Sequence, residues 1–346
     1  MSLELKIIDP ITDDRWDKQL IPPADYSIFH SSAWASVLSK SYRYRPLYLI
    51  LSDKNNIAAR IPFMEINSFI TGRRGVSLPF SDYCDPILDN EIPLENILDR
   101  LIDFGQKFGW KYLELRCSKR LIHNQEPSTF FYGHTLDLSR KEEQLLSGCR
   151  DSTKRNIRKA KKTGVTVIID NSYKAMCEYY RLHSITRRRQ GVPPQPFHFF
   201  KNIHNNLISK NRGLIVLASY NKDIIAGNIY LHFHRKAYYK FGATDMNSQH
   251  LRPSNIVMWE AIKWYAKHGY KSLCFGRTSP DNKGLLQYKK GWGTDQKVIN
   301  YYKYDFNRNS FVKDGPQENS ISTMIFKRLP IPILKLAGNI LYKHVG

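Results

Sequence analysis

The chain has 346 residues, 42% of them hydrophobic, which is enough for about two globular domains. It contains no apolar run long enough to span a bilayer and no signal peptide, so we expect a cytoplasmic protein. Its five cysteines are widely spaced without a CxxC pair, which argues against a disulfide framework or a structural zinc site. The net charge of +22 favours polyanionic partners: nucleic acid, anionic lipid, or nucleotide- and CoA-linked substrates.

The first 140 residues alternate between helix and strand patterns. Helices are predicted over 33–42 and 93–110, and strands over 47–53, 56–66, 111–117 and 131–138. Between them, residues 73–88 are predicted to form a strand that emerges into a loop. In this stretch we expect Arg73 and Arg74 to add positive charge to a substrate pocket and Asp82 to shape its wall. No histidine lies nearby in sequence to complete a metal site with Asp82 and Asp85, so we expect no metal.

The middle of the chain begins with a strongly basic helical pattern over 141–164, which carries seven Lys or Arg among positions 150–162. A solvated helix face is the plain interpretation, and phosphates of nucleic acid or anionic lipid are the alternative partners. A helix over 172–189 then ends in Arg187, Arg188 and Arg189, next to the proline-stiffened segment 190–196. We expect these arginines to grip substrate, the alternative being a basic helix end that complements the helix dipole.

Residues 237–305 have the pattern strand, loop, helix, strand, helix, strand, with polar and glycine residues at the turns. Ser254 or Asn255 is a plausible cap for the first helix, which would end at Gly269. Arg252 and the free N–H groups of that helix would then lie at the carboxyl edge of a sheet, a common place for a phosphate or carboxylate. An ordinary connection with a surface arginine is the alternative.

The two halves of the chain resemble each other. A glycine–aromatic–lysine turn leads into a strand at 109–117 and again at 269–277, and each half has a similar strand hairpin before it. We therefore predict an α/β protein with two tandem units and mixed sheets, divided into 1–145, 146–312 and a C-terminal tail over 313–346.

Several of these segments together resemble the Fem-type peptidyltransferases of the wider GNAT acyltransferase superfamily. They are FGATD (241–245), RPSN (252–255), FGRTSPDNKGLLQYKKGWG (275–293) and YYKYD (301–305), with WASVL (34–38), 73–86 and 186–200 from the remainder. The resemblance covers roughly residues 25–310, and its most specific part is GLLxYKKGWG. It implies tandem GNAT-like domains and transfer of an acyl or aminoacyl group onto an amine.

The resemblance also implies roles for individual residues. Lys289 is expected at the rim of its helix near the transferring acyl group, where an ammonium would stabilise the oxyanion. Two further roles are suggested by the residues themselves and not by the resemblance. Asp245 is a candidate base for the attacking amine, with a turn or cap as the alternative. Arg277, at the end of its strand, is a candidate phosphate ligand, with a salt bridge to Asp281 or Asp245 as the alternative. The expected substrate-binding set also includes Tyr239, Arg252, Ser254, Asn255, Tyr288 and Trp292.

The donor is left open between aminoacyl-tRNA and acyl-CoA, neither of them a tightly bound cofactor. Residues 246–254 lack the glycine run with which GNAT enzymes expose backbone N–H groups to the CoA pyrophosphate. The acceptor is expected to be an amine on a large anionic precursor of the peptidoglycan or cell-envelope type, held in a groove between or across the two domains. Two alternatives remain: a CoA-dependent N-acetyltransferase of a small molecule, and a non-catalytic nucleic-acid-binding module.

The C-terminal tail predicts a basic amphipathic helix over 331–346. Ile333, Leu334 and Ile340 share one face in this pattern, with Lys335 and Lys343 opposite. Such a helix either docks on its own domain or contacts the inner face of a membrane as a peripheral anchor.

Overall fold

The computed structural model describes residues 4–20, 26–53, 56–88, 94–315 and 321–346. The chain divides into two compact units. Unit 1 comprises Met1–Tyr132, Lys297–Gln317 and Leu341–Gly346, and unit 2 comprises Gly133–Gln296 and Glu318–Ile340. The sequence predicts contiguous domains, whereas the units interleave along the chain, because two long strands, β7 (Thr129–Asp137) and β13 (Asp295–Asp305), each pass from one unit into the other.

Unit 1 is built on a mixed sheet with the strand order β1-β2-β3-β4-β6-β13, in which only β4 and β6 are parallel. The short strands β5 and β14 pair with β3 and β13, respectively. Its other elements in chain order are β1 (Glu4–Ile8), α1 (Trp16–Gln19), η1 (Ile28–His30), α2 (Ser32–Tyr42), β2 (Arg45–Asp53), β3 (Asn56–Ser68), β4 (Gly72–Val76), β5 (Ile87–Leu88), α3 (Glu95–Lys107), β6 (Tyr112–Cys117), β14 (Ser310–Phe311) and η4 (Tyr342–His344).

The helices of unit 1 follow their sequence signals closely. Ser31 caps α2 by accepting from the Trp34 N–H, and α2 ends where Arg43 adopts a left-handed conformation. In α3 the apolar residues Ile97, Leu101 and Phe104 are buried. They join Phe63, Leu113 and other strand residues in the core of the unit, which is where most of its stability arises.

Unit 2 is also built on a mixed sheet, with the order β8-β9-β10-β11-β12-β7. Its elements are α4 (Glu142–Ser147), α5 (Asp151–Lys162), β8 (Thr166–Ile169), α6 (Tyr173–Gln190), α7 (Phe197–Asn206), η2 (Ile208–Lys210), β9 (Gly213–Tyr220), β10 (Asp223–Phe233), β11 (Lys236–Thr244), η3 (Met246–Leu251), α8 (Pro253–Lys267), β12 (Ser272–Thr278), α9 (Lys283–Lys290), α10 (Ile321–Arg328) and α11 (Ile331–Leu341). The α/β fold with mixed sheets predicted from the sequence is confirmed.

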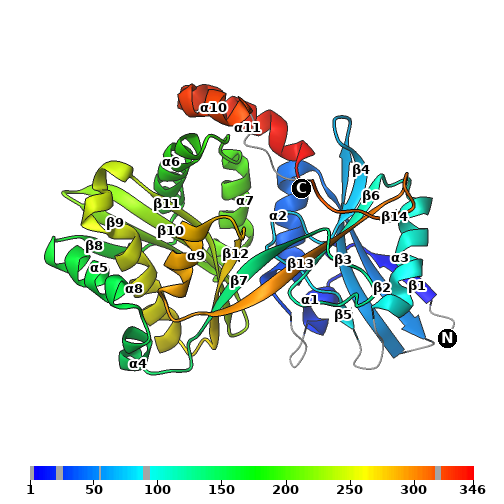
Figure 1. The fold of residues 1–346 in the computed structure, drawn as a ribbon, viewed down its shortest axis with the longest axis horizontal. Coiled ribbons are helices and arrows are strands. Elements are labelled where there is room, and N and C mark those ends of the chain that lie inside the picture. Colours follow the sequence, from blue (N-terminus) through cyan, green and yellow to red (C-terminus); the bar gives the residue numbers. More distant parts are fainter. Residues whose placement is uncertain (1–3, 21–25, 54–55, 89–93, 316–320) are drawn as a thin grey trace. The chain divides into compact units, whose positions relative to one another are not determined.

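Helices cover both faces of the unit 2 sheet (Figure 1). Val216 and Ala226 point into the core that contains Trp259 of α8. The next residue of β10, Gly227, lies against Tyr179 of α6 instead. Because successive strand residues point to opposite faces, α8 and α6 lie on opposite sides of the sheet.

Two local predictions are wrong. The basic pattern over 141–164 forms two helices rather than one, because the chain turns at Gly148–Arg150, where the Arg150 N–H donates to the Gly291 carbonyl. Neither Ser254 nor Asn255 caps α8. The helix begins at Pro253, two residues before the start that a Ser254 cap predicts. Proline has a fixed φ that suits the first helical position, and Arg252 precedes it in a left-handed conformation.

In the described part of the chain, no helix combines the length and the apolar composition that crossing a bilayer would require.

Candidate functional site

The sheet of unit 2 opens between β11 and β12. These two strands pair in parallel over only three residues of each, 236–238 with 272–274, although both continue to Thr244 and Thr278. On its other side β11 is bulged, since its ladder with β10 shifts register between Ile229 and Tyr230. Beyond residues 238 and 274, β11 and β12 therefore continue without a ladder between them.

Lys289 lies beside this opening. Its side chain is 3% exposed, and its Nζ donates to the Gly276 carbonyl at 2.9 Å and the Arg277 carbonyl at 3.1 Å. Gly276 has φ of +71°, a conformation that glycine adopts without strain. The expectation that Lys289 lies at the rim is therefore wrong: the ammonium is buried against β12, while the next residue, Lys290, is exposed.

Tyr239 lies on β11 directly after the residues that pair with β12. Its ring lies 5.6 Å from the ring of Tyr230 and 6.2 Å from that of Phe275. Burial raises the pKa of Tyr239 to about 12, so the hydroxyl stays protonated at neutral pH and can serve as a hydrogen-bond donor. Tyr288 of α9 is half-buried and lies edge-on to Trp292 at 6.1 Å.

Trp292 itself is a core residue. It is 0% exposed and belongs to the hydrophobic core of unit 2 with Trp259 and Phe275. Trp292 is therefore closed off from solvent, and its role in substrate contact stays a prediction.

The loop between β11 and α8 is tied down by short polar contacts. Asp245 accepts from the Asn247 N–H at 3.0 Å, which caps η3, and the Thr244 and Ser254 hydroxyls are 2.6 Å apart. The Arg252 Nε is buried and, among the described residues, has no hydrogen-bond partner. Asn255 is 9% exposed in the first turn of α8. The predicted loop residues are thus together at the open end of β11.

The C-terminal end of α6 reaches the same loop. The Thr186 hydroxyl accepts from the Thr244 N–H at 3.2 Å, and Arg187 follows it directly. Arg187 is half-buried and donates to the Gln190 side chain at 3.1 Å, whereas Arg188 and Arg189 are exposed. Thr186 was not predicted from the sequence, because a threonine on a buried helix face has no pattern that separates it from core.

His134 of β7 is a second residue that the sequence did not reveal. It is 0% exposed, and burial together with the charges of Lys289 and Lys290 lowers its pKa to about 4. The imidazole is therefore neutral at physiological pH. A lone histidine in a strand pattern carries no sequence signal for such a neighbourhood, because the lysines are more than 150 positions away.

The comparisons with known proteins address this unit directly. The family model described as acetyltransferase (GNAT) domain matches residues 147–290. Over this range, which is less than half of the chain, the sequence is similar to GNAT acetyltransferase domains. No curated protein matches the chain in sequence.

Solved structures extend the likeness from the GNAT domain to most of the chain. FemX aligns with a TM-score of 0.66 and 14% identity, over 88% of this chain and 98% of that chain. L-PGS from Bacillus licheniformis aligns with a TM-score of 0.52 and 12% identity, over 87% of this chain and 91% of that chain. An N-myristoyltransferase of Saccharomyces cerevisiae with bound myristoyl-CoA aligns with a TM-score of 0.53 and 11% identity, over 95% of this chain and 84% of that chain. The fold is that of a FemAB-like tandem GNAT protein, as the sequence resemblance implied.

The residues predicted in unit 1 are held by internal contacts. Arg73 forms a two-pronged ion pair with buried Glu65, at 2.9 and 3.1 Å. Arg74 is 2% exposed and donates to the His344 carbonyl at 2.8 Å. This guanidinium fastens the C-terminal residues to β4, so the expectation of an Arg74 that faces a substrate pocket is not met.

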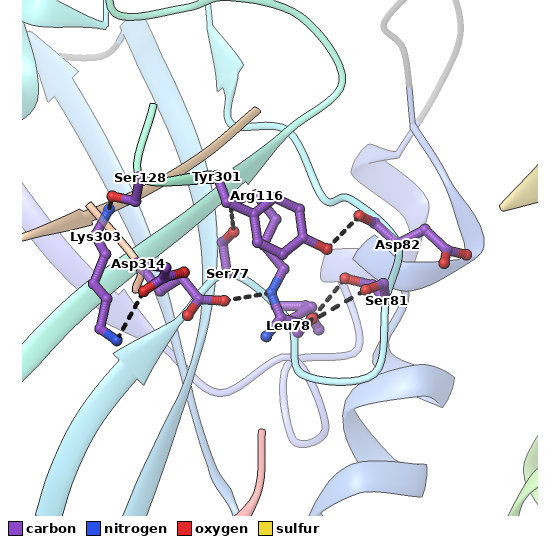
Figure 2. A network of polar contacts seen from close by, with 10 residues as sticks. Ser77, Leu78, Ser81, Asp82, Arg116, Ser128, Tyr301, Lys303 and Asp314 are labelled. Carbon is purple, nitrogen blue, oxygen red and sulfur yellow. Dashed lines mark hydrogen bonds and ion pairs between the residues drawn. The ribbon is translucent and has the colours of Figure 1, made fainter. Parts of the chain in front are cut away.

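Asp82 lies beside a polar network that the sequence did not predict (Figure 2). Its backbone carbonyl accepts from the Tyr301 hydroxyl at 2.7 Å. The Tyr301 ring in turn lies 5.2 Å from the buried guanidinium of Arg116, which donates to Glu114 at 2.7 Å. A signal was present, because Glu114 and Arg116 are opposite charges two positions apart and so share a strand face.

The buried His183 of α6 is expected to make the stability of the protein depend on pH in the acid range. His183 is 4% exposed and contacts the Gln195 side chain at 2.8 Å, and burial, followed by the charge of Arg187, lowers its pKa to about 3. A depressed histidine pKa means that the unfolded state binds more protons below about pH 6.5, so this contribution is complete above pH 6.5 and is lost as the pH falls toward 3.

Between about pH 6.5 and pH 5 the loss from His183 should reach about 2 kcal/mol of unfolding free energy. We therefore expect urea denaturation to show that His183→Gln loses less stability than the wild-type protein over this range. The exposed His198 gives the matched variant, His198→Gln, which should lose as much as wild type. Equal acid sensitivity of all three proteins would contradict the assignment.

Proposed function

We propose that this protein transfers an acyl or aminoacyl group from an activated donor to the amine of an acceptor. The observation that carries the proposal is the opening between β11 and β12 in a GNAT domain, with the Lys289 ammonium buried beside it on the carbonyls of Gly276 and Arg277. An extended acyl donor is proposed to lie in this opening, where the ammonium would supply positive charge near the donor carbonyl.

In the proposed reaction the neutral amine of the acceptor attacks the carbonyl carbon of the donor. The carbonyl oxygen gains negative charge in the tetrahedral intermediate, which the Lys289 ammonium stabilises together with the protonated Tyr239 phenol. The bond from carbon to the leaving oxygen or sulfur then breaks, and the proton lost by the amine passes to a base and on to the leaving group. Asp245 is the carboxylate proposed as that base.

The donor is proposed to be aminoacyl-tRNA, with acyl-CoA as the alternative. In place of a glycine run, residues 246–251 form η3 and Arg252 adopts a left-handed conformation before α8. The aligned N-myristoyltransferase holds myristoyl-CoA, which keeps a CoA thioester in consideration for this fold. The deciding experiment offers aminoacyl-tRNA, acyl-CoA and acyl-carrier donors in parallel and detects complexes by native mass spectrometry. Retention of acyl-CoA alone would overturn the tRNA assignment.

The acceptor is proposed to be a large anionic, amine-bearing precursor of the cell envelope, at the inner face of the membrane. The net charge of +22 and the likeness to FemX support a large anionic substrate over a small neutral one. Arg187, Arg188, Arg189 and Arg277 are the residues proposed to contact its charged groups. Transfer to a small-molecule amine with equal efficiency would contradict this proposal.

Helix α5 is proposed as the contact for the tRNA phosphates. Thr153, Ile157 and Ala160 face the core, while Arg155, Arg158 and Lys159 are exposed. Cations on one exposed helix face can neutralise phosphates and release their counterions.

Replacing Arg155, Arg158 and Lys159 by glutamine together should therefore weaken binding of aminoacyl-tRNA and flatten its salt dependence. Three lost contacts reduce the slope of log K against log salt by about 2 to 3. A variant with glutamine at Lys174, Lys201 and Lys210 removes the same charge from other exposed positions of unit 2 and should keep the wild-type slope. If both variants lose affinity equally, net charge rather than α5 is responsible. Fluorescence anisotropy across a salt series measures both quantities.

A further inference from the structure

Helix α11 carries two apolar stripes, and only one of them is covered. Leu334 and Gly338 are buried. Ile333, Leu336 and Ile340 are 49%, 61% and 52% exposed, at positions that share one face of a helix. The predicted amphipathic face is thus divided, with Leu334 buried and Ile333 and Ile340 exposed. A helix that only closed its own domain would need just one apolar stripe.

The contacts of the buried stripe of α11 determine which face of the helix carries the exposed stripe. A Cβ on Gly338 would lie 2.1 Å from the Pro194 carbonyl oxygen, so the helix backbone itself rests on the proline-rich segment that follows α6. Directly after Leu334 in the same helix, the Nζ of Lys335 lies 4.9 Å from the centre of the Tyr180 ring of α6. Helix α10 packs against α6 (Figure 1). Both terminal helices are therefore seated on unit 2, and Ile333, Leu336 and Ile340 remain outside.

Cations accompany the exposed apolar residues. In α10, Met324 and Ile325 are 63% and 52% exposed, and the exposed Lys327 and Arg328 form its last turn. Exposed Lys343 follows α11 in η4. Apolar side chains that project outward among lysines and arginines are the pattern of a helix that lies in a membrane interface.

The end of the chain in unit 1 adds a second apolar group. Phe69, at the tip of the hairpin between β3 and β4, is 86% exposed and lies edge-on to His344 at 4.6 Å. Ile70 and Val345 are 57% and 53% exposed. The Tyr44 hydroxyl donates to the Val345 carbonyl at 2.6 Å, so this apolar group is held in place and does not belong to a frayed end.

We propose that the exposed stripe of α11, with α10, binds the surface of an anionic lipid bilayer, and that the hairpin tip at Phe69 and Ile70 is a second lipid contact. Lipid fits better than a second copy of this chain, because another copy would bring its own net charge of +22 against Lys327, Arg328 and Lys343. The inference does not depend on the transfer chemistry, because none of these residues belongs to the opening between β11 and β12.

The test uses the full chain and vesicles of phosphatidylcholine, with and without about 30% phosphatidylglycerol, at low and high salt. Wild-type protein should sediment with the anionic vesicles at low salt. Leu336→Ser combined with Ile340→Ser should lower the affinity at least tenfold. For a matched control, Ile340→Ser is compared with Ile168→Ser, because Ile168 on β8 is 54% exposed and Ile340 is 52% exposed. Ile168→Ser should bind as wild type does.

Each other outcome overturns part of the proposal. Failure of the wild-type protein to bind anionic vesicles, or undiminished binding by the double variant, overturns the assignment of α11. Equal binding to neutral vesicles overturns the requirement for anionic lipid, and undiminished binding by Phe69→Ser with Ile70→Ser overturns the hairpin contact. If sedimentation velocity shows a dimer for the wild-type protein and a monomer for the double variant, the stripe is assigned to a second copy of the chain. Unchanged thermal unfolding of the variants shows that the fold is intact.

Discussion

Replacing Lys289 by methionine is expected to lower kcat by about 100- to 1000-fold and to leave KM within a few-fold of the wild-type value. A fixed positive charge stabilises the oxyanion only when that charge has developed, so its removal acts on the transition state and not on substrate binding. Methionine keeps the length and apolar stem of the lysine side chain while deleting the ammonium.

The ammonium of Lys289 also donates to the Gly276 and Arg277 carbonyls, so its removal could loosen β12 as well as the chemistry. Two variants separate these effects. Lys290→Met deletes a charge from the exposed neighbouring position and should leave kcat close to wild type. Lys289→Arg keeps a cation and should retain more activity than Lys289→Met.

Steady-state kinetics with the donor identified by native mass spectrometry, together with thermal unfolding of each variant, provide the measurements. A rise in KM at unchanged kcat would make Lys289 a binding residue. An unchanged kcat in Lys289→Met, combined with loss of nucleic-acid binding in the α5 variant, would favour the non-catalytic binding module.

The elements of this fold could be predicted because their signals are local. The helix patterns placed α2, α3 and α8, since each depends on residues within one or two turns. The exact start of α8 was missed because Arg252 adopts a left-handed conformation, which is uncommon outside glycine and asparagine. Proline at position 253 was the available signal.

The environment of the site residues could not be predicted in the same way. Whether Lys289 faces solvent depends on the direction from which α9 meets β12, and the pattern of an eight-residue helix does not specify that direction. Arg74 was expected in a substrate pocket, but its partner is His344, which lies 270 positions away. Lys289 was predicted mainly from the family resemblance, and Asp245 and Arg277 from their residue types and positions. Their roles stay predictions until the kinetics are measured.

Trp292→Ala is expected to lower the free energy of unfolding by about 3–5 kcal/mol, the usual cost of emptying a large aromatic site in a packed core. Trp292 is 0% exposed, and Tyr288, edge-on to it at 6.1 Å, would lose its ring partner. Trp292→Phe should cost less, because a smaller ring leaves a smaller cavity. Urea denaturation of the three proteins measures the difference.

The same variants decide between a core role for Trp292 and the substrate contact that the sequence suggested. A core residue affects activity only through the folded fraction, so KM of Trp292→Phe, measured well below its unfolding midpoint, should stay within about twofold of wild type. A KM that rises tenfold at unchanged stability would restore Trp292 to the substrate site. The complete burial of Trp292 in the hydrophobic core of unit 2 favours the first result.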